Sequence, residues 1–397
     1  MIFKPVHYLW HGFGTLFLSA LACFFFTLIS YNSAFMDPIS QAIGGFSFID
    51  SYFYIENKNA NESVDFNDDI LLFDIAGCNS RAAIAGKIDE ITKLGPKVIG
   101  MDVIYGDNST TSQADNDSLV RVVSRCPQLV TALRIVESNG QTDVEHSFYT
   151  RLTQVDEASI NVEDGVVRDF VRELNIGGVK KQSFVDRIVQ KADSTAYARL
   201  TARGNNEERI NFKALEFMQL GMSDELFPED VAGKIVLIGD FQDLRDFHNV
   251  PTTIGASQRI AGTKIHAYAI STLLHPERTL DKMSDCGGWI FGLILSYFFS
   301  IFACLCFVEI DKLGGVSTNL VMVLMLAVLS MMGGLIFINF NYELDMTVAM
   351  LGIGLAGNTS EMWFWLCTTK PYQWVRKKMH LPDGGVRYFV NNEGNRE

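Results

Sequence analysis

The chain has 397 residues, 48% of them hydrophobic, and a net charge of −13. The whole acidic excess falls between residues 33 and 285. Such a segment argues against nucleic-acid binding, which depends on Lys and Arg to neutralise phosphates. The apolar residues, including 29 Phe, gather in a few long runs, which indicates a membrane protein.

Four apolar runs are each about twenty residues long, which is enough to cross roughly 30 Å of hydrocarbon. They lie at Phe13–Tyr31, Trp289–Val308, Leu320–Ile338 and Met346–Leu366. The first three lack formal charge, whereas the fourth contains Glu361. The first run is long for a secretory signal and has no convincing cleavage site after it, so we expect an uncleaved anchor.

The basic residues near the last run set the expected orientation. Lys370, Arg376, Lys377 and Lys378 follow this run, whereas the loop before it has no Lys or Arg. The C-terminal tail is therefore expected in the cytoplasm. Four spans divide the chain into a cytoplasmic N-terminus with the first span (1–32), an extracytoplasmic domain (33–285), three further spans (286–368) and a short cytoplasmic tail (369–397).

Two apolar strands flank a helical pattern near the start of the long segment. Asp68–Gly77 and Lys97–Gly106 are continuous apolar stretches, typical of parallel strands covered on both faces. Between them, Ser80–Gly95 has apolar residues at helical spacing, and either Asn79 or Ser80 can cap its N-terminus. This order predicts a βαβ unit.

The same alternation recurs after this unit. We expect a helix at Asn116–Cys126, strands at Gln128–Val136 and Gly233–Phe241, and a helix at Gly262–Leu274, with an irregular region in the middle. The predicted fold class is α/β, with a Rossmann-like, largely parallel sheet in the extracytoplasmic domain and a four-helix transmembrane part. About 250 residues is a size that a single core can fill.

Three carboxylates lie toward the ends of the apolar strands, namely Asp74, Asp102 and Asp240. Ligands bind at the carboxyl ends of open parallel sheets, so these side chains are candidates for one binding crevice. Each carboxylate can also serve only to accept backbone N–H groups in the turn that follows. Convergence of all three would favour binding.

The densest polar cluster contains Asp240, Asp243, Arg245, Asp246 and His248. It follows a strand, where loops commonly carry binding residues, and these groups suit a divalent cation or a cationic or hydroxylated small molecule. A solvated loop of ordinary turn residues is the alternative reading.

His266 lies on a largely apolar helical pattern, which is more typical of a packed core residue than of a pH sensor or, with His248, a metal ligand. A disulfide between Cys78 and Cys126 is an open possibility, and no C-x-x-C metal spacing occurs.

Nucleotide-binding, protease, hydrolase and kinase motifs are absent from the sequence. We therefore expect no enzymatic activity, and we predict no cofactor or metal site.

The membrane part offers candidate contacts of its own. Asn358 and Glu361 share one helical face in the fourth run, where they can contact another span or a partner, or Glu361 can reach the headgroups. The tail provides further candidates for lipid or partner contact, namely Trp374, Arg376, Lys377 and Lys378.

Several phrases together resemble the CHASE family, type two, over most of residues 65–310. They include "IDEITKLGPKVIGMDVIYGD", "DGVVRDF", "VAGKIVLIGDF" and "GTKIHAYAISTLLH". The resemblance implies a bacterial extracytoplasmic sensory domain flanked by membrane spans. It also implies a turn at Asp164 and Gly165, with Arg168 on the following strand as a ligand-site candidate or a partner of an acidic group. The stretch after Asp74 departs from the family by lacking its usual tryptophan and proline.

Members of this family often continue into a cyclase, kinase or phosphatase, but only about 30 residues follow the last run here, fewer than a catalytic domain needs. We therefore expect a sensory or regulatory subunit of the bacterial inner membrane that detects a small molecule or envelope state and signals to a separate effector protein. A homo-oligomer is expected. The alternative is a non-sensing scaffold or a pore-forming component of a membrane complex.

The predicted topology can be tested with a reporter that is active only outside the cytoplasm. Fused after Asp107 or Asp345, the reporter should be active, because both positions lie on the outer side of a four-span chain. Fused after Lys378, it should be silent. Activity at Lys378 would contradict the four-span arrangement.

Overall fold

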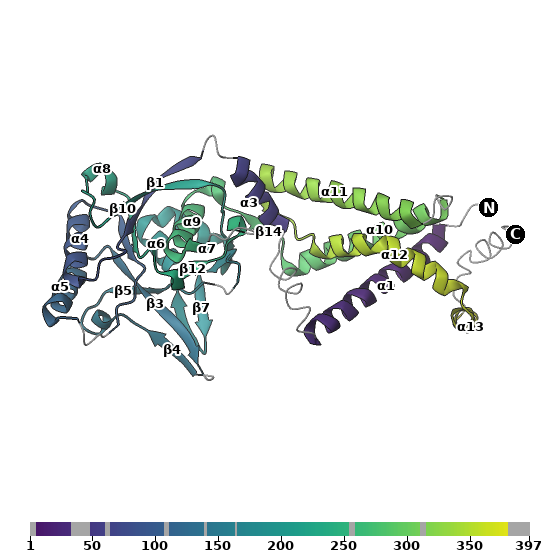
Figure 1. The fold of residues 1–397 in the computed structure, drawn as a ribbon, viewed down its shortest axis with the longest axis horizontal. Coiled ribbons are helices and arrows are strands. Elements are labelled where there is room, and N and C mark those ends of the chain that lie inside the picture. Colours follow the sequence, from purple (N-terminus) through teal and green to yellow (C-terminus); the bar gives the residue numbers. More distant parts are fainter. Residues whose placement is uncertain are drawn as a thin grey trace. The chain divides into compact units, whose positions relative to one another are not determined.

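A computed structural model describes residues 5–32, 48–59, 64–106, 111–138, 141–162, 165–253, 259–309 and 315–379. The predicted turn residue Asp164 and the tail beyond Met379 lie outside these ranges. The chain forms two compact units (Figure 1). Residues 50–280 form an α/β unit, and residues 1–49 with 281–397 form a helical unit.

The α/β unit is built on a seven-stranded sheet with the order β10-β1-β11-β2-β3-β4, in which β5 also pairs with β3. All neighbouring strands are parallel except β3 and β4. The prediction of an α/β fold with a largely parallel sheet is therefore confirmed. The strands are β1 (Asp65–Asp74), β2 (Val98–Met101), β3 (Leu129–Ser138), β4 (Gln141–Glu145), β5 (Asp156–Ser159), β10 (Leu215–Gly221) and β11 (Ile235–Gly239).

The predicted βαβ unit is present as β1, α4 (Arg81–Lys93) and β2. Ser80 caps α4, because its hydroxyl accepts a hydrogen bond from the backbone N–H of Ala83 at 3.2 Å. The two strands are parallel but are not neighbours. β11, which comes more than 130 residues later in the chain, lies between them and pairs with both.

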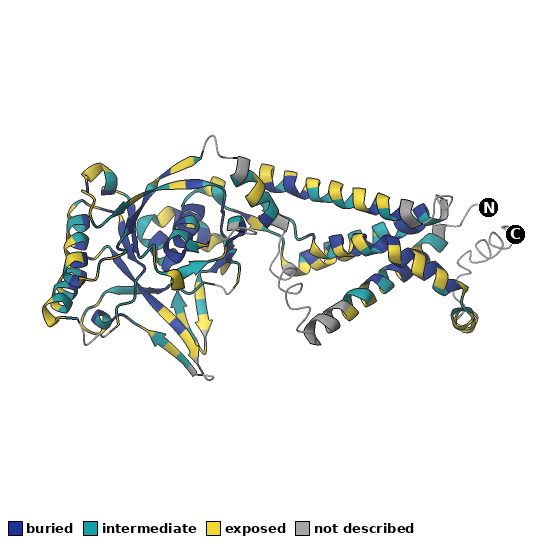
Figure 2. Ribbon diagram, in the orientation of Figure 1, coloured by how far each residue is buried: buried dark blue, intermediate teal, exposed yellow. Residues whose placement is uncertain are grey.

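Helices cover both faces of this sheet (Figure 1), which explains why its strands are continuous apolar runs. Leu71 and Phe73 of β1 belong to the buried cluster that includes α4 and α5 (Gln113–Val123). On the other face, α6 (Phe184–Ala192) and α9 (Gly262–Leu274) contact the central strands. Figure 2 shows the buried residues concentrated in these strands and on the inward faces of the helices.

The region predicted to be irregular contains regular elements. Short antiparallel pairs form between β6 and β9 and between β7 and β8. The remaining elements of the unit are α3 (Phe48–Asn59), β6 (Asp169–Val171), β7 (Glu173–Ile176), β8 (Val179–Gln182), α7 (Ser194–Arg203), β9 (Glu207–Arg209), α8 (Pro228–Val231), β12 (Phe247–His248) and β13 (Ile260–Ala261), with short 3₁₀ turns.

The helical unit contains α1 (Pro5–Asn32), α10 (Asp285–Glu309), α11 (Gly315–Phe340), α12 (Thr347–Thr368) and α13 (Lys370–Lys378). A short parallel pair joins β14 (Asp281–Lys282) to β15 (Tyr342–Glu343). Within the described ranges, three helices are long and apolar enough to cross a membrane, with spans at His7–Phe25, Cys286–Phe307 and Thr318–Phe340.

The fourth predicted span is the helix α12, but it is not one of these three. The polar sequence "NTSE" at 358–361 lowers its hydropathy. α12 nevertheless packs against α1, α10 and α11. Polar contacts also join it to α1, because Ser19 and Thr359 share a hydrogen bond of 2.8 Å and Trp363 Nε1 donates to His11 Nδ1 at 3.0 Å.

A buried ion pair ties α3 to the rest of the α/β unit. Arg168 donates from Nε to Asp50 Oδ1 at 3.0 Å and from Nη2 to Oδ2 at 2.5 Å. The Asp50 side chain is 0% exposed and that of Arg168 is 16% exposed. Since a buried charge without its partner is costly, this pair fixes where α3 docks.

Arg168→Met should lower the free energy of unfolding of the α/β unit by about 3–5 kcal/mol, because it removes the Arg168 guanidinium from the buried Asp50 carboxylate. Unfolding can be followed in urea by alkylation of Cys126, which is 5% exposed in this unit, with mass spectrometry to identify the labelled thiol. The double substitution Asp50→Leu with Arg168→Met should recover most of the loss.

The matched control is Lys93→Met, which removes a surface pair with Asp89 and should leave the urea midpoint nearly unchanged. Equal effects of Arg168→Met and Lys93→Met would contradict a structural role for the buried pair.

Candidate functional site

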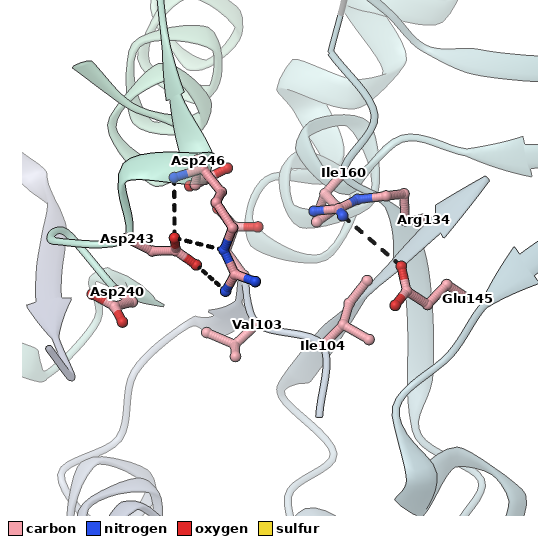
Figure 3. A pocket seen from close by; sticks show the side chains of 10 residues that line it. Val103, Ile104, Arg134, Glu145, Ile160, Asp240, Asp243 and Asp246 are labelled. Atoms are coloured by element: carbon pink, nitrogen blue, oxygen red, sulfur yellow. Dashed lines mark hydrogen bonds and ion pairs between the residues drawn. The ribbon is translucent and has the colours of Figure 1, made fainter. Parts of the chain in front are cut away.

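A cleft of about 390 Å³ opens at the carboxyl ends of β2 and β11 (Figure 3). Its wall is formed by the loops after these strands, by β3 and β4, and by the end of β5. It combines five carboxyl groups, two guanidinium groups and three apolar side chains. These residues are Asp102, Glu145, Asp240, Asp243, Asp246, Arg134, Arg245, Val103, Ile104 and Ile160.

Asp102 is the most buried carboxylate of the cleft, with 9% of the residue exposed. It directly follows β2, and its backbone N–H donates to the carbonyl of Ile238 on β11 at 2.8 Å. Its Oδ2 accepts a hydrogen bond from Thr263 Oγ1 at 2.7 Å and lies 3.8 Å from Nε2 of His266. Both of these side chains belong to α9, so Asp102 connects the cleft to this helix.

Burial raises the pKa of Asp102 above its ordinary value. The charge of Asp246 acts in the same direction, whereas His266, the Thr263 hydroxyl and Arg134 oppose it without reversing the shift. A protonated Asp102 can donate a hydrogen bond into a cleft whose other carboxylates are acceptors.

Two glycines allow the first turn of α9 to lie against the sheet edge. A Cβ on Gly239, at the end of β11, would lie 2.0 Å from Thr263 Oγ1. A Cβ on Gly262 would lie 2.6 Å from Asp246 Oδ1. With no side chain at Gly262, its backbone N–H donates to Asp246 Oδ2 at 3.1 Å. The close approach that brings Thr263 to Asp102 therefore requires a residue without a Cβ at position 239.

The loop after β11 is held by its own side chains. Arg245 donates to both oxygens of Asp243, at 3.0 Å from Nε and 2.7 Å from Nη2. These hydrogen bonds lower the pKa of Asp243 to about 2, so its carboxylate is ionised at neutral pH. Asp240 uses one oxygen to accept the backbone N–H of Gln242 at 2.9 Å. This loop is thus both an ordered turn and one wall of the cleft.

Arg134 and Glu145 form the opposite wall (Figure 3), with 3.9 Å between Nη1 and Oε2. Both side chains are 52% exposed, so the pair is loose and accessible to a ligand. They are brought together by the antiparallel register of β3 and β4, in which they are directly paired residues. The sequence analysis missed both residues. It did not predict β4, the strand that places Glu145 beside Arg134.

The other predicted ligand-binding residues lie outside the lining of the cleft. Asp74 accepts the backbone N–H groups of Ala76 at 2.8 Å and Phe241 at 3.2 Å, which fits the turn-forming reading. His248 belongs to β12, with its Nε2 3.6 Å from Asp246 Oδ1. Arg168 pairs with Asp50, as described above.

The structure therefore brings together at the cleft the predicted ligand-binding residues Asp102, Asp240 and Asp246, with Asp243 and Arg245 of the predicted polar cluster. His266 is packed, as expected, against Phe184 with 5.3 Å between ring centroids, but it also lies beside Asp102. The long-range contact between the two was missed, because nothing in the sequence aligns α9 with the end of β2.

No group of three or more His, Cys, Asp or Glu side chains is placed to hold a metal ion within the described ranges. Cys78 and Cys126 are free thiols rather than a disulfide. Cys126 instead lies 3.3 Å from the Thr92 hydroxyl, and the Cys78 thiol lies 3.7 Å from the carbonyl of Ser80.

The predicted membrane and partner contacts are on the outer surface of the helical unit. Asn358 and Glu361 are exposed on α12. Trp374 of α13 is 64% exposed, and Lys378 Nζ lies 5.0 Å from the centre of its ring. Arg376 and Lys377 complete the basic last turn of this helix.

Comparison with known families identifies the α/β unit. The CHASE2 domain family model matches residues 61–304, which is more than half of the chain. The protein belongs to this family of sensory domains, and the resemblance seen in the sequence is confirmed. Searches of curated proteins and of solved structures returned no match. With its candidate membrane helices, the chain has the features of a membrane protein that carries a sensory domain.

Replacing Asp102 with Asn tests the raised pKa of this carboxyl. Because the folded protein holds the proton more tightly than the unfolded chain, the wild-type free energy of unfolding should fall as pH rises from the ordinary pKa of 3.8 through the folded-state pKa. The limiting slope is about 1.4 kcal/mol per pH unit. Asp102→Asn lacks this dependence, so its stability relative to wild type should increase with pH.

The urea midpoint of the full chain, followed by Cys126 alkylation at several pH values, measures this difference. If the stability of Asp102→Asn relative to wild type stays constant or falls as pH rises, the pKa of Asp102 is not raised in the folded protein.

Proposed function

We propose that this protein is a membrane-anchored sensory subunit whose α/β unit binds a small molecule in the Asp102 cleft and signals to a separate effector protein. The observation that carries this proposal is the cleft itself. It lies at the carboxyl ends of parallel strands, where α/β folds bind ligands, and its buried carboxyl group directly contacts a helix.

The chemistry of the cleft favours a cationic or polyhydroxylated ligand. Four carboxylates accompany Asp102, whereas only Arg134 and Arg245 carry positive charge. Arg245 is already engaged by Asp243. Asp240 and Glu145 remain on opposite walls as acceptors for ammonium or hydroxyl groups, and the volume of about 390 Å³ suits a small molecule.

The helix α9 provides a route from the cleft toward the membrane helices. Its first turn contacts Asp102, and residues 275–284 connect its end to α10 along the chain. Tyr268 of α9 also packs on Phe212, with 5.4 Å between ring centroids, and Phe212 packs on Phe53 of α3 at 6.2 Å. A ligand that shifts α9 would thus act on both segments that lead to the helical unit.

The proposed location is a bacterial cytoplasmic membrane, with the α/β unit outside and both chain termini inside. In this arrangement α12 is the fourth span. Its packing against α1, α10 and α11 supports this placement, because a helix in contact with three spans shares their surroundings. We further propose that the chain is a homo-oligomer without enzymatic activity of its own, and that the basic α13 contacts anionic lipids or the effector.

The proposed binding site can be tested by screening the full-length chain against diamines, polyamines, amino acids and sugars. A ligand at a hundredfold excess over its dissociation constant should stabilise the α/β unit by about 2.7 kcal/mol, read from Cys126 protection in urea. Asp240→Asn and Glu145→Gln should each reduce this stabilisation, because they remove acceptors from opposite walls of the cleft.

Glu229→Gln is the matched control, since it neutralises an exposed carboxylate on α8, away from the cleft lining, and should leave ligand stabilisation intact. Ligands that stabilise both cleft variants as strongly as wild type would show that binding occurs elsewhere.

A further inference from the structure

The helix α12 has one buried face and one narrow exposed face. Its buried residues include Gly352, Ile353, Ala356, Thr359 and Ser360, which pack within the helical unit. On the opposite side, where Met362 is also exposed, five of the exposed residues form a line that we name the α12 stripe. The stripe consists of Leu351, Gly354, Asn358, Glu361 and Trp365.

The spacing of the α12 stripe is that of a helix–helix seam. Its members are separated alternately by three and four residues, which is the heptad pattern of two helices in left-handed packing. The line covers two heptads, over which an ideal helix drifts by only about 40°, so all five positions lie on one face that a second helix can contact.

The exposed faces of the other long helices have a different chemistry. On α1, α10 and α11 the large exposed side chains are apolar, as expected for contact with lipid tails. They include Phe13, Phe17, Leu293, Phe298, Leu324 and Val328. Only the α12 stripe places an amide and a carboxyl group side by side on the outer surface among these described helices, and such groups are costly against lipid.

The polar groups of the stripe complement one another. Asn358 Oδ1 accepts a hydrogen bond from Asn319 Nδ2 at 3.0 Å, which orients the Asn358 amide and leaves its N–H groups as donors. Glu361, one helical turn further along, supplies acceptors. Gly354 leaves room for close approach, since a Cβ there would meet only Leu326 Cδ1, at 3.8 Å.

We propose that the α12 stripe binds the same stripe of a second copy of this chain, with the two helices parallel about a twofold axis. The inference rests on the proposed function, in which α12 is a membrane span. Two copies inserted in the same direction are necessarily parallel, and a twofold axis places each stripe position opposite itself. The Asn358 amide then lies within one helical turn of the partner's Glu361.

The test measures dimerisation of the full-length chain in liposomes by energy transfer between labelled copies at several protein-to-lipid ratios. Gly354→Phe adds bulk at the centre of the stripe, where a single chain has open space, and should raise the dimer dissociation constant about tenfold or more. Asn358→Leu combined with Glu361→Leu removes the polar contacts and should also weaken the dimer.

Ala327→Phe is the matched control, because it adds the same bulk to the exposed apolar face of α11 and should leave dimerisation unchanged. A monomeric wild-type chain, or stripe variants that dimerise as well as wild type, would overturn the proposal. An equal loss in Ala327→Phe would also overturn it, since a general effect of bulk would then explain the result.

Ligand stabilisation of Gly354→Phe separates this inference from the proposed function. A chain that binds its ligand at the cleft but does not associate through the stripe contradicts the inference alone. A chain that dimerises through the stripe but binds no ligand at the cleft contradicts the sensory proposal alone. Reporter activity after Lys378 would remove α12 as a fourth span and would overturn the inference at its premise.

Discussion

The hydrogen bond between Asp102 and Thr263 is the contact on which the organisation of the α/β unit depends. It joins the end of a central strand to the first turn of α9, and it is possible only because Gly239 has no side chain. Burying a carboxyl group costs free energy unless it is hydrogen-bonded or protonated. Here the Thr263 hydroxyl supplies a hydrogen bond, and burial raises the pKa of Asp102. The Asp102 side chain also lines the cleft. One side chain therefore contacts both the proposed ligand site and the first turn of α9.

The strands and helices were predictable where the hydrophobic pattern of a segment matches its burial in the folded unit. Continuous apolar strands identified a sheet covered on both faces, and Gly262–Leu274 was predicted with the bounds that α9 has in the structure. Asp102 was identifiable as a candidate because a carboxylate in a buried strand needs a reason to be there. The position of β11 between β1 and β2 was not predictable, since strand order depends on contacts between segments more than 130 residues apart.

The missed features share this dependence on long-range pairing. Arg134 and Glu145 form a wall of the cleft only through the register of β3 and β4, and His266 meets Asp102 only once α9 docks. Asp74, which resembles the other strand-end carboxylates in sequence, instead accepts two backbone N–H groups.

In the membrane part, the length of the fourth run predicted a helix correctly. Its polar residues divide between a buried face and the α12 stripe, which a hydropathy average does not resolve.

The central claim is that Asp102 couples the cleft to α9 and, through Tyr268 and Phe212, to α3. Hydrogen–deuterium exchange of the full-length chain carrying Thr263→Val measures this coupling without knowledge of the ligand. The account predicts faster exchange along α9, in the loop at 240–246 and in α3, while α4 on the opposite face of the sheet keeps its wild-type rate. Faster exchange confined to the substituted turn, or an equal increase in α4, would contradict it.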